Sequence, residues 1–255
     1  MHIRTASKRP RGTYSVLPRE LLCFAMFVFL SFSGHAATPS QRCTDSFLNG
    51  EPLDLETCRP APVSPADKNL VMRSLPTKGE VRRLSKSERK KLDELKPVLR
   101  LHKRDRAYDI KVISVPQAWT GLHERAVLLI SRPALGLLSS EELQALAAHE
   151  IGHEYLWDSY LVAQRQNDTK RLCDLELACD AIAVLTLEGL RVSTDNLTAG
   201  LEKVHQFNFQ RFGWASNESS YPTAAARRRL VKVMSSRKDG DPKLGFQLVV
   251  TKDLQ

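Results

Sequence analysis

The sequence lacks the features of repetitive and membrane-spanning proteins. Its 255 residues contain no internal repeat and no low-complexity tract, which argues against a fibrous, collagenous or wholly disordered chain. After residue 37, no apolar run reaches the length of about 20 residues that is needed to cross a bilayer. Hydrophobic residues make up 42% of the chain and charged residues 26%, as is usual for globular proteins. We therefore expect one domain of ordinary size, or at most two small ones.

Aromatic residues are also scarce, at 7% of the chain, and none lies in the most basic segment, residues 78–106. Much of the net charge of +9 comes from this segment. A basic segment can bind nucleic acid or acidic lipid, but this one has no interleaved aromatic residue and no recognised binding motif. We interpret it as a solvated helix and expect no nucleic acid partner. A nucleic-acid-binding function, the alternative, would require DNA binding that weakens steeply with salt.

The one strongly apolar run lies near the N-terminus, at residues 21–32. Several basic residues precede it, and the small residues Gly34 and Ala36 follow it. This order is typical of a secretory signal peptide. We therefore predict a signal peptide at residues 1–36 and an exported protein, either periplasmic or secreted. Retention as an N-terminal membrane anchor is the less favoured alternative, because the run is short for a membrane span.

Cysteine is infrequent, with five residues in the whole chain. One of them, Cys23, lies in the predicted signal peptide, which leaves Cys43, Cys58, Cys173 and Cys179. An even number in an exported protein suggests disulfides, with three possible pairings. The Cys43–Cys58 pair is the simplest, because it closes a short loop in a Pro-rich stretch. The other two lie six residues apart on one predicted helix, hence on different faces, and should not pair with each other.

Two segments follow the predicted signal peptide: a Pro-rich, irregular N-terminal segment at residues 37–78 and a folded domain at residues 79–255. Within and around them, apolar spacing, turn residues and capping residues predict both helices and strands. The predicted helices are 80–103, 140–163, 170–188, 194–207 and 222–233, and the predicted strands are 108–115, 126–131 and 246–251. The second of these helices begins with a capping box formed by Ser139 and Glu142.

The strongest functional signal is the pentapeptide His149-Glu150-Ile151-Gly152-His153. Residues four apart on a helix share one face, so His149 and His153 can bind one zinc ion. Glu150 lies beside the first histidine, where it can act as the general base that takes a proton from the attacking water. The alternative is a polar helix face that carries two histidines by coincidence.

A catalytic zinc site needs a third protein ligand and one open position. Glu176 and Asp180 lie one turn apart on the otherwise apolar helix at 170–188. Acidic residues in apolar surroundings are costly unless they bind something. We predict that Glu176 is the third ligand, and that Asp180 accepts a hydrogen bond from the second ring nitrogen of a ligand histidine. The alternative is a pair of solvated acids on an exposed edge.

These motifs resemble those of a known family, the gluzincin zinc metallopeptidases typified by the CAAX prenyl proteases and the HtpX-type proteases. The stretch at 126–154 is similar to the strand and active-site helix of that family, and the Glu176–Asp180 spacing matches the pattern of its second helix. The residues Gln117-Ala118-Trp119 stand where the family has an Asn-Ala-aromatic turn. Cys179 falls where the family often has Ala, which favours a small buried cysteine over a ligand. The resemblance covers residues 108–233.

Two departures from the family are evident. The family has a His-Pro and a downstream Arg that help to bind the oxyanion, whereas this chain has Tyr221-Pro222, with Arg227 at the matching spacing. The resemblance implies that Tyr221 donates a hydrogen bond in place of the histidine and that Arg227 stabilises the anionic intermediate; a basic helix start on the surface is the alternative. The best-known members span membranes several times, and this chain resembles the smaller soluble members.

The resulting prediction is an α+β, zincin-like fold, mainly helical with a small sheet. The domain at 79–255 is predicted to be a zinc metalloendopeptidase that holds one zinc ion per chain. Its substrates would be proteins or peptides, including membrane-proximal ones, paired with an edge strand for which residues 126–131 are the candidate. A zinc-binding scaffold with a chaperone-like or assembly role is the alternative. The retained Glu150 argues against that alternative, and the replacement of the family histidine by Tyr221 argues for it.

Overall fold

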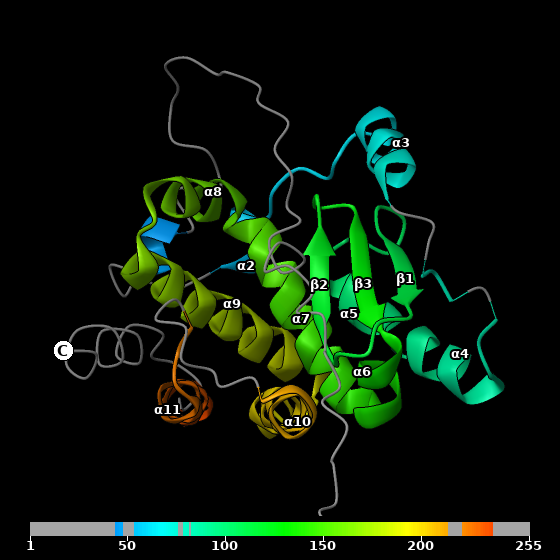
Figure 1. Ribbon diagram of the computed structural model, residues 1–255. Coiled ribbons are helices and arrows are strands. Elements are labelled where there is room, and N and C mark those ends of the chain that lie inside the picture. Colours follow the sequence, from blue (N-terminus) through cyan, green and yellow to red (C-terminus); the bar gives the residue numbers. More distant parts are fainter. Residues whose placement is uncertain (1–43, 48–53, 76–78, 82, 214–220, 237–255) are drawn as a thin grey trace, which may run out of the picture. The chain divides into compact units, whose positions relative to one another are not determined.

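Three short strands form the sheet of the molecule, whose computed structural model describes residues 44–47, 54–75, 79–81, 83–213 and 221–236. Strand β1 (Asp109–Ile113) pairs in parallel with β3 (Val127–Ser131). Strand β2 (Thr120–His123) pairs with the other side of β3 in the antiparallel sense. The chain is mainly helical around this mixed sheet, which agrees with the predicted α+β class (Figure 1). The predicted signal peptide, Cys43 and the predicted strand at 246–251 lie outside the described residues.

The sheet order β1-β3-β2 makes β3 the central strand. The prediction that residues 126–131 form an edge strand is therefore wrong. A nearly continuous apolar run is typical of a strand that is buried on both faces, and Val127, Leu128 and Ile130 are fully buried. The edge beside helix α7 (Ser140–Tyr155) is β2, which the sequence did not predict (Figure 1).

The turn between β2 and β3 explains why β2 escaped prediction. Its two central residues, Glu124 and Arg125, have φ values of 47° and 56°. Turns of this kind usually contain Asn or Gly, which tolerate positive φ, and these residues are the hairpin signal in a sequence. Here Arg125 donates a hydrogen bond to Ala61 O at 2.6 Å and contacts Glu154 at 3.5 Å. Contacts with distant parts of the chain therefore hold a turn that its own residues disfavour.

Two predicted helices are each divided into two. In place of the helix predicted at 80–103 the structure has two shorter helices, α4 (Lys86–Asp93) and α5 (Lys96–Leu101). The predicted start is wrong, because Glu80 forms a β-bridge with Ile113. A new helix begins at α5 because Pro97 lies in its first turn, and a proline cannot continue a preceding helix. The helix predicted at 140–163 consists of α7 and α8 (Trp157–Gln166), and Leu156 between them has φ −109° and ψ 11°. The capping box of Ser139 and Glu142 at the start of α7 is confirmed.

The remaining helices follow the predicted order. Helix α9 (Thr169–Leu190) extends the predicted segment slightly at both ends. Helix α10 (Asp195–Phe212) continues beyond its predicted end, and α11 (Ala224–Ser235) begins and ends two residues later than predicted. A short helix that was not predicted, α6 (Arg132–Leu137), follows β3. Thr223 caps α11, so Pro222 lies just before the helix and not in its first turn. Among the described residues, no helix has both the length and the apolar character that a membrane span requires.

Helices α7 and α9 lie against each other at the centre of the domain (Figure 1). They approach each other closely at Gly152, where a Cβ atom would lie only 2.8 Å from the Cα atom of Cys179. The obstacle is backbone and cannot swing away, so a larger residue at this position would push the helices apart. The glycine of the pentapeptide therefore sets the distance between the two helices that carry the candidate ligands.

The N-terminal segment contains more regular structure than the Pro-rich sequence predicted. It forms α2 (Leu55–Cys58) and α3 (Pro65–Ser74), and residues 44–47 make a helical turn in which Phe47 is fully buried. The prediction of an irregular segment is wrong for these parts. Proline at the start of α3 is compatible with a helix, because the first turn does not need its N–H group.

Buried charges attach this segment to the main helices. Arg104, which is 1% exposed, donates to Pro60 O at 2.6 Å and to the Glu154 carboxylate of α7 at 2.7 Å. The Tyr108 hydroxyl donates to the same carboxylate at 2.6 Å. Because Glu154 is fully buried, its charge depends on these partners. Residues 58–61 are therefore part of the fold of this domain.

A second buried polar group, His102, lies between α5 and the central helices. Thr186 already donates its hydroxyl proton to Ile182 O at 2.7 Å, so it accepts a hydrogen bond from His102 Nε2 at 2.9 Å. His102 Nδ1 therefore accepts from the Tyr155 hydroxyl, also at 2.9 Å. Burial, together with the charge of the nearby arginines, lowers the pKa of His102 to about 3. The imidazole is thus neutral in the folded protein.

The buried His102 predicts a loss of stability in mild acid. The unfolded chain binds a proton at this histidine below its ordinary pKa of about 6.5, whereas the folded chain does so only near 3. Stability should fall as the pH drops from 6.5 towards 3, by about 2 kcal/mol between pH 7 and pH 5. Denaturant unfolding with chelator present measures this loss without metal release. His102→Gln should remove about 2 kcal/mol of the pH dependence, and an unchanged dependence would contradict the prediction.

Candidate metal centre

Three side chains converge between α7 and α9. His149 and His153 lie one turn apart on α7, and Glu176 faces them from α9. His149 Nε2 lies 3.5 Å from Glu176 Oε2, and His153 Nε2 lies 3.6 Å from Glu176 Oε1. One potential ligand atom from each of the three residues lies within 4.8 Å of the others. The structure therefore brings together the three residues that the sequence predicted as metal ligands.

The spacing of these atoms fits a small metal ion. Around a tetrahedral ion with bonds of about 2.0–2.1 Å, neighbouring ligand atoms are roughly 3.4 Å apart. The observed N–O distances of 3.5 and 3.6 Å are close to that value. The His149 side chain is 6% exposed and that of Glu176 3%, so the cluster is not a chance meeting of mobile surface groups. His153 is 17% exposed, which leaves the cluster reachable from its side.

Asp180 and Arg227 hold this cluster from behind. Asp180 Oδ1 lies 2.9 Å from His149 Nδ1, as predicted from the spacing of the acids on the helix. This hydrogen bond makes Nδ1 the protonated nitrogen and leaves His149 Nε2 to face Glu176. Arg227 Nη1 binds both oxygens of Asp180, at 2.5 and 2.7 Å, and its Nη2 lies 3.3 Å from Glu176 Oε2. The ligand histidine and the ligand carboxylate are thus both oriented by fixed partners.

The carboxylates make the cluster attractive to positive charge. Burial alone would lower the pKa of His149, but hydrogen bonds to Asp180 and Glu176 outweigh it and raise the pKa to about 10. For Glu176, burial raises the pKa, yet the neighbouring His153, His149 and Arg227 outweigh it and lower the pKa below its usual value. Glu176 is therefore ionised. A cation, whether a proton or a metal ion, is stabilised at this point.

Glu150 lies at the same centre on the side of the sheet. Its side chain is 8% exposed, and Glu150 Oε1 accepts a hydrogen bond of 2.8 Å from the Thr120 hydroxyl. Thr120 begins β2, so the edge strand positions the carboxylate. The sequence reasoning missed Thr120, because the signal for its strand was hidden by the unusual turn at 124–125.

Two further side chains contact the ligand histidine His153. The Tyr160 ring meets the imidazole edge-on, with 5.1 Å between ring centres, and its hydroxyl donates to Glu176 Oε1 at 3.4 Å. Cys179 Sγ lies 3.5 Å from His153 Nδ1 and is fully buried, which agrees with the prediction of a small buried cysteine. No local pattern in the sequence pointed to Tyr160, because it follows His153 across the break at Leu156.

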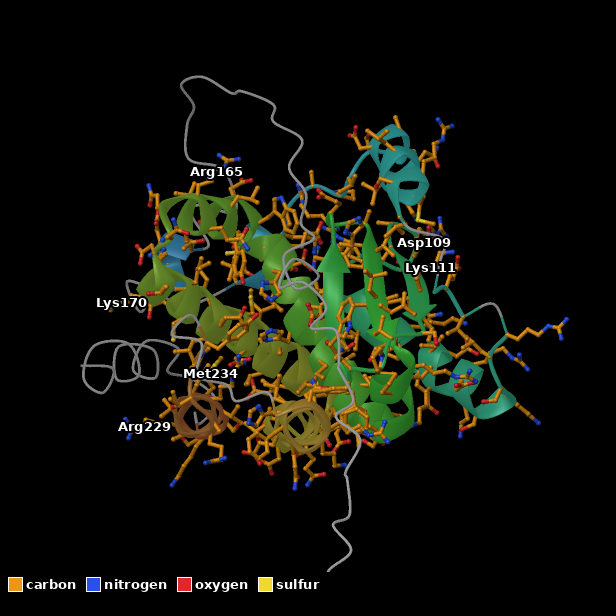
Figure 2. All side chains as sticks on the ribbon, in the orientation of Figure 1. Asp109, Lys111, Arg165, Lys170, Arg229 and Met234 are labelled. Atoms are coloured by element: carbon orange, nitrogen blue, oxygen red, sulfur yellow. The ribbon has the colours of Figure 1, made fainter. Side chains whose placement is uncertain are left out.

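Tyr221 and Arg227, the predicted oxyanion residues, differ in burial: Arg227 is buried and Tyr221 is exposed. Arg227 is buried and points towards α9, where it binds Asp180 and Glu176. Its neighbours Arg228 and Arg229 are exposed, and Figure 2 shows Arg229 on the side of α11 that is turned away from α9. Tyr221 is 47% exposed. Burial, followed by the charge of Glu176, raises the pKa of Tyr160, and the nearby Tyr221 acts in the same direction. The catalytic role of Tyr221 and Arg227 stays a prediction.

The remaining cysteines and His205 do not add to the cluster. Cys173 and Cys179 are free thiols and do not pair with each other, as expected. The Cys43–Cys58 pairing stays a prediction because Cys43 lies outside the described residues. His205 stacks on Phe209 of its own helix, with 6.3 Å between ring centres.

Comparison with known proteins does not identify a function for the chain. No protein-family model matches the chain. No curated protein matches it either. The resemblance to the gluzincin metallopeptidases therefore rests on the sequence motifs alone.

Proposed function

We propose that the protein is a zinc-dependent metalloendopeptidase with a zincin-like fold. The observation that carries the proposal is the convergence of His149, His153 and Glu176, with the Glu150 carboxylate beside them. Two imidazoles and one carboxylate are the donor set of many catalytic zinc sites, which keep a fourth position open. A general base adjacent to that position is what hydrolysis requires in addition.

The chain's own residues support a simple division of roles. A zinc ion held by the three ligands would polarise the scissile carbonyl and lower the pKa of water. Glu150 takes the proton from the attacking water and later gives it to the leaving amine. Thr120 holds the Glu150 carboxylate through a hydrogen bond of 2.8 Å. Asp180 keeps the proton of His149 on Nδ1, so that Nε2 can act as a ligand.

We propose that the substrate is an extended segment of a protein or peptide, which aligns with the edge of β2. Edge strands can add an extended peptide through main-chain hydrogen bonds. Among the described strands β2 is the edge strand next to α7, and its first residue, Thr120, touches Glu150. A peptide paired with β2 would therefore pass close to the general base. Membrane-proximal proteins are included in this substrate class.

Export is a separate proposal that rests on the sequence of residues 1–36. The basic start, the short apolar run and the small residues before residue 37 support a cleaved signal peptide. N-terminal sequencing of the protein recovered outside the cytoplasm tests it. A mature chain that begins near residue 37 is expected, and an intact N-terminus would favour the anchor alternative.

The proposed function predicts one tightly bound zinc ion per chain. Atomic absorption of the purified protein should give one zinc, and a casein assay should detect cleavage that a chelator abolishes. Glu176→Ala removes a ligand and should weaken zinc binding by more than about 100-fold. Loss of a residue that only hydrogen-bonds to a ligand already costs up to about 100-fold. Asp174→Ala, on the same helix, is the matched control, because Asp174 is not among the three converging residues.

Other outcomes separate the alternatives. Zinc binding without cleavage of casein or any peptide mixture would favour the zinc-binding scaffold. If the protein binds no zinc, the His149–His153 spacing is a coincidence and the proposed function is wrong.

A further inference from the structure

The phenol of Tyr160 has contacts that a core residue does not need. Its ring packs edge-on against His153, with 5.1 Å between ring centres, and its hydroxyl donates to Glu176 Oε1 at 3.4 Å. Two of the three candidate ligands therefore contact this one side chain. That distance is longer than the usual range of about 2.5–3.0 Å for O–H···O hydrogen bonds, so the contact is weak and the hydroxyl proton is available to a stronger acceptor.

The break between α7 and α8 accounts for this position. In a continuous helix, residues seven apart are separated by about 10 Å along the axis. At Leu156 the backbone leaves helical geometry, with φ −109° and ψ 11°, and α8 turns to pack on α9 (Figure 1). Tyr160 consequently lies over the second histidine of the pentapeptide. The same break that divides the predicted helix supplies a hydroxyl to the candidate metal centre.

Tyr160 is also more buried than the tyrosine that the family resemblance suggests. The Tyr221 side chain is 47% exposed, whereas Tyr160 is partly buried and held by His153 and Glu176. Stabilisation of a developing charge depends on donors that are already in place before the reaction. Arg227 is the other predicted donor, and its guanidinium is bound to Asp180 and Glu176.

We propose that Tyr160 is a catalytic residue whose hydroxyl donates a hydrogen bond to the oxyanion formed from the scissile carbonyl; this inference rests on the proposed function. When the water oxygen bonds to the carbonyl carbon, the carbonyl π electrons move to its oxygen, and the water proton moves to Glu150. The new negative charge accepts the Tyr160 proton as a hydrogen bond in place of Glu176 Oε1. When the C–N bond breaks, the carbonyl re-forms and Glu150 protonates the amine.

The test compares Tyr160→Phe with Tyr221→Phe in the zinc-loaded protein. Tyr160→Phe keeps the ring on His153 and removes only the hydroxyl. It should lower kcat by about 100- to 1,000-fold, the usual cost of one oxyanion donor, with little change in KM. Tyr221→Phe should cause a smaller loss. Calorimetry with a phosphinic analogue of the fastest-cleaved casein peptide adds a binding readout, and Tyr160→Phe should weaken that analogue by the same factor as kcat/KM.

Three results would overturn the inference. The first is cleavage at the wild-type rate by Tyr160→Phe, which would leave the proposed function standing. The second is a loss of zinc affinity that accounts for the lost activity, because Tyr160 would then be a positioning residue for Glu176. The third is a larger loss in Tyr221→Phe than in Tyr160→Phe. Failure of the proposed function is distinguished from all three by a wild-type protein that does not cleave.

Discussion

Replacing Glu150 by glutamine is expected to remove most of the peptide cleavage while zinc binding is kept. The amide has the shape of the carboxylate and can still accept the hydrogen bond from Thr120, which measures 2.8 Å in the structure. It cannot accept a proton from water, so the step assigned to the general base is lost. Positioned general bases contribute about 100- to 10,000-fold to rates, and kcat/KM should fall within that range.

The measurement needs three values from the same preparation: zinc content, unfolding free energy and kcat/KM. Only kcat/KM should change, because Glu150 is not among the three converging ligand residues. Cleavage by Glu150→Gln at the wild-type rate would show that another group acts as the base. Parallel loss of zinc would show that Glu150 itself holds the metal, and the assignment of ligands would have to be revised.

Glu154→Gln, one helical turn further along α7, is expected to lower the stability of the fold. Glu154 is fully buried and accepts hydrogen bonds from Arg104 at 2.7 Å and from the Tyr108 hydroxyl at 2.6 Å. The neutral amide leaves the buried Arg104 without its counter-charge. Removal of one partner of a buried ion pair typically costs 3–5 kcal/mol, so the free energy of unfolding should decrease by about that amount.

Urea unfolding of Glu150→Gln and Glu154→Gln gives a matched comparison, because both variants make the same chemical change on the same helix. The double variant Arg104→Met, Glu154→Leu should recover much of the lost stability, because it removes both charges. A Glu154→Gln variant as stable as the wild type would mean that solvent reaches Arg104. The network would then not explain how residues 58–61 are held to the domain.

Local signals in the sequence predicted the elements that depend on them. The capping box of Ser139 and Glu142 fixed the start of α7, and the apolar pattern of α9 predicted a buried helix with Glu176 and Asp180 on it. The spacing of His149 and His153 placed both histidines on one face of α7, and the packing of α7 against α9 brings Glu176 to them. Each of these inferences uses residues within one helix or one pair of helices.

The parts that could not be predicted depend on contacts between distant residues. The hairpin turn at 124–125 has no Asn or Gly and is held by the contacts of Arg125 with Ala61 and Glu154. This turn concealed β2, so Thr120 was missed as part of the site. The break at Leu156 has no proline or glycine beside it, so Tyr160 was missed as well. The position of Arg227 depends on how α11 docks against α9, which helical periodicity alone does not define.

The contact between Arg227 and Asp180 can form only late in translation, because α11 is synthesised after α9. The two residues are 47 positions apart in the chain, and translation produces the histidines, Glu176 and Asp180 before α11. Until α11 has been synthesised and has docked, the two acids of α9 lack the guanidinium that binds them in the folded protein. In a nascent chain the candidate ligand Glu176 therefore does not yet have its contact with Arg227. Under the proposed function, hydrolytic activity would arise only once synthesis of the domain is nearly finished.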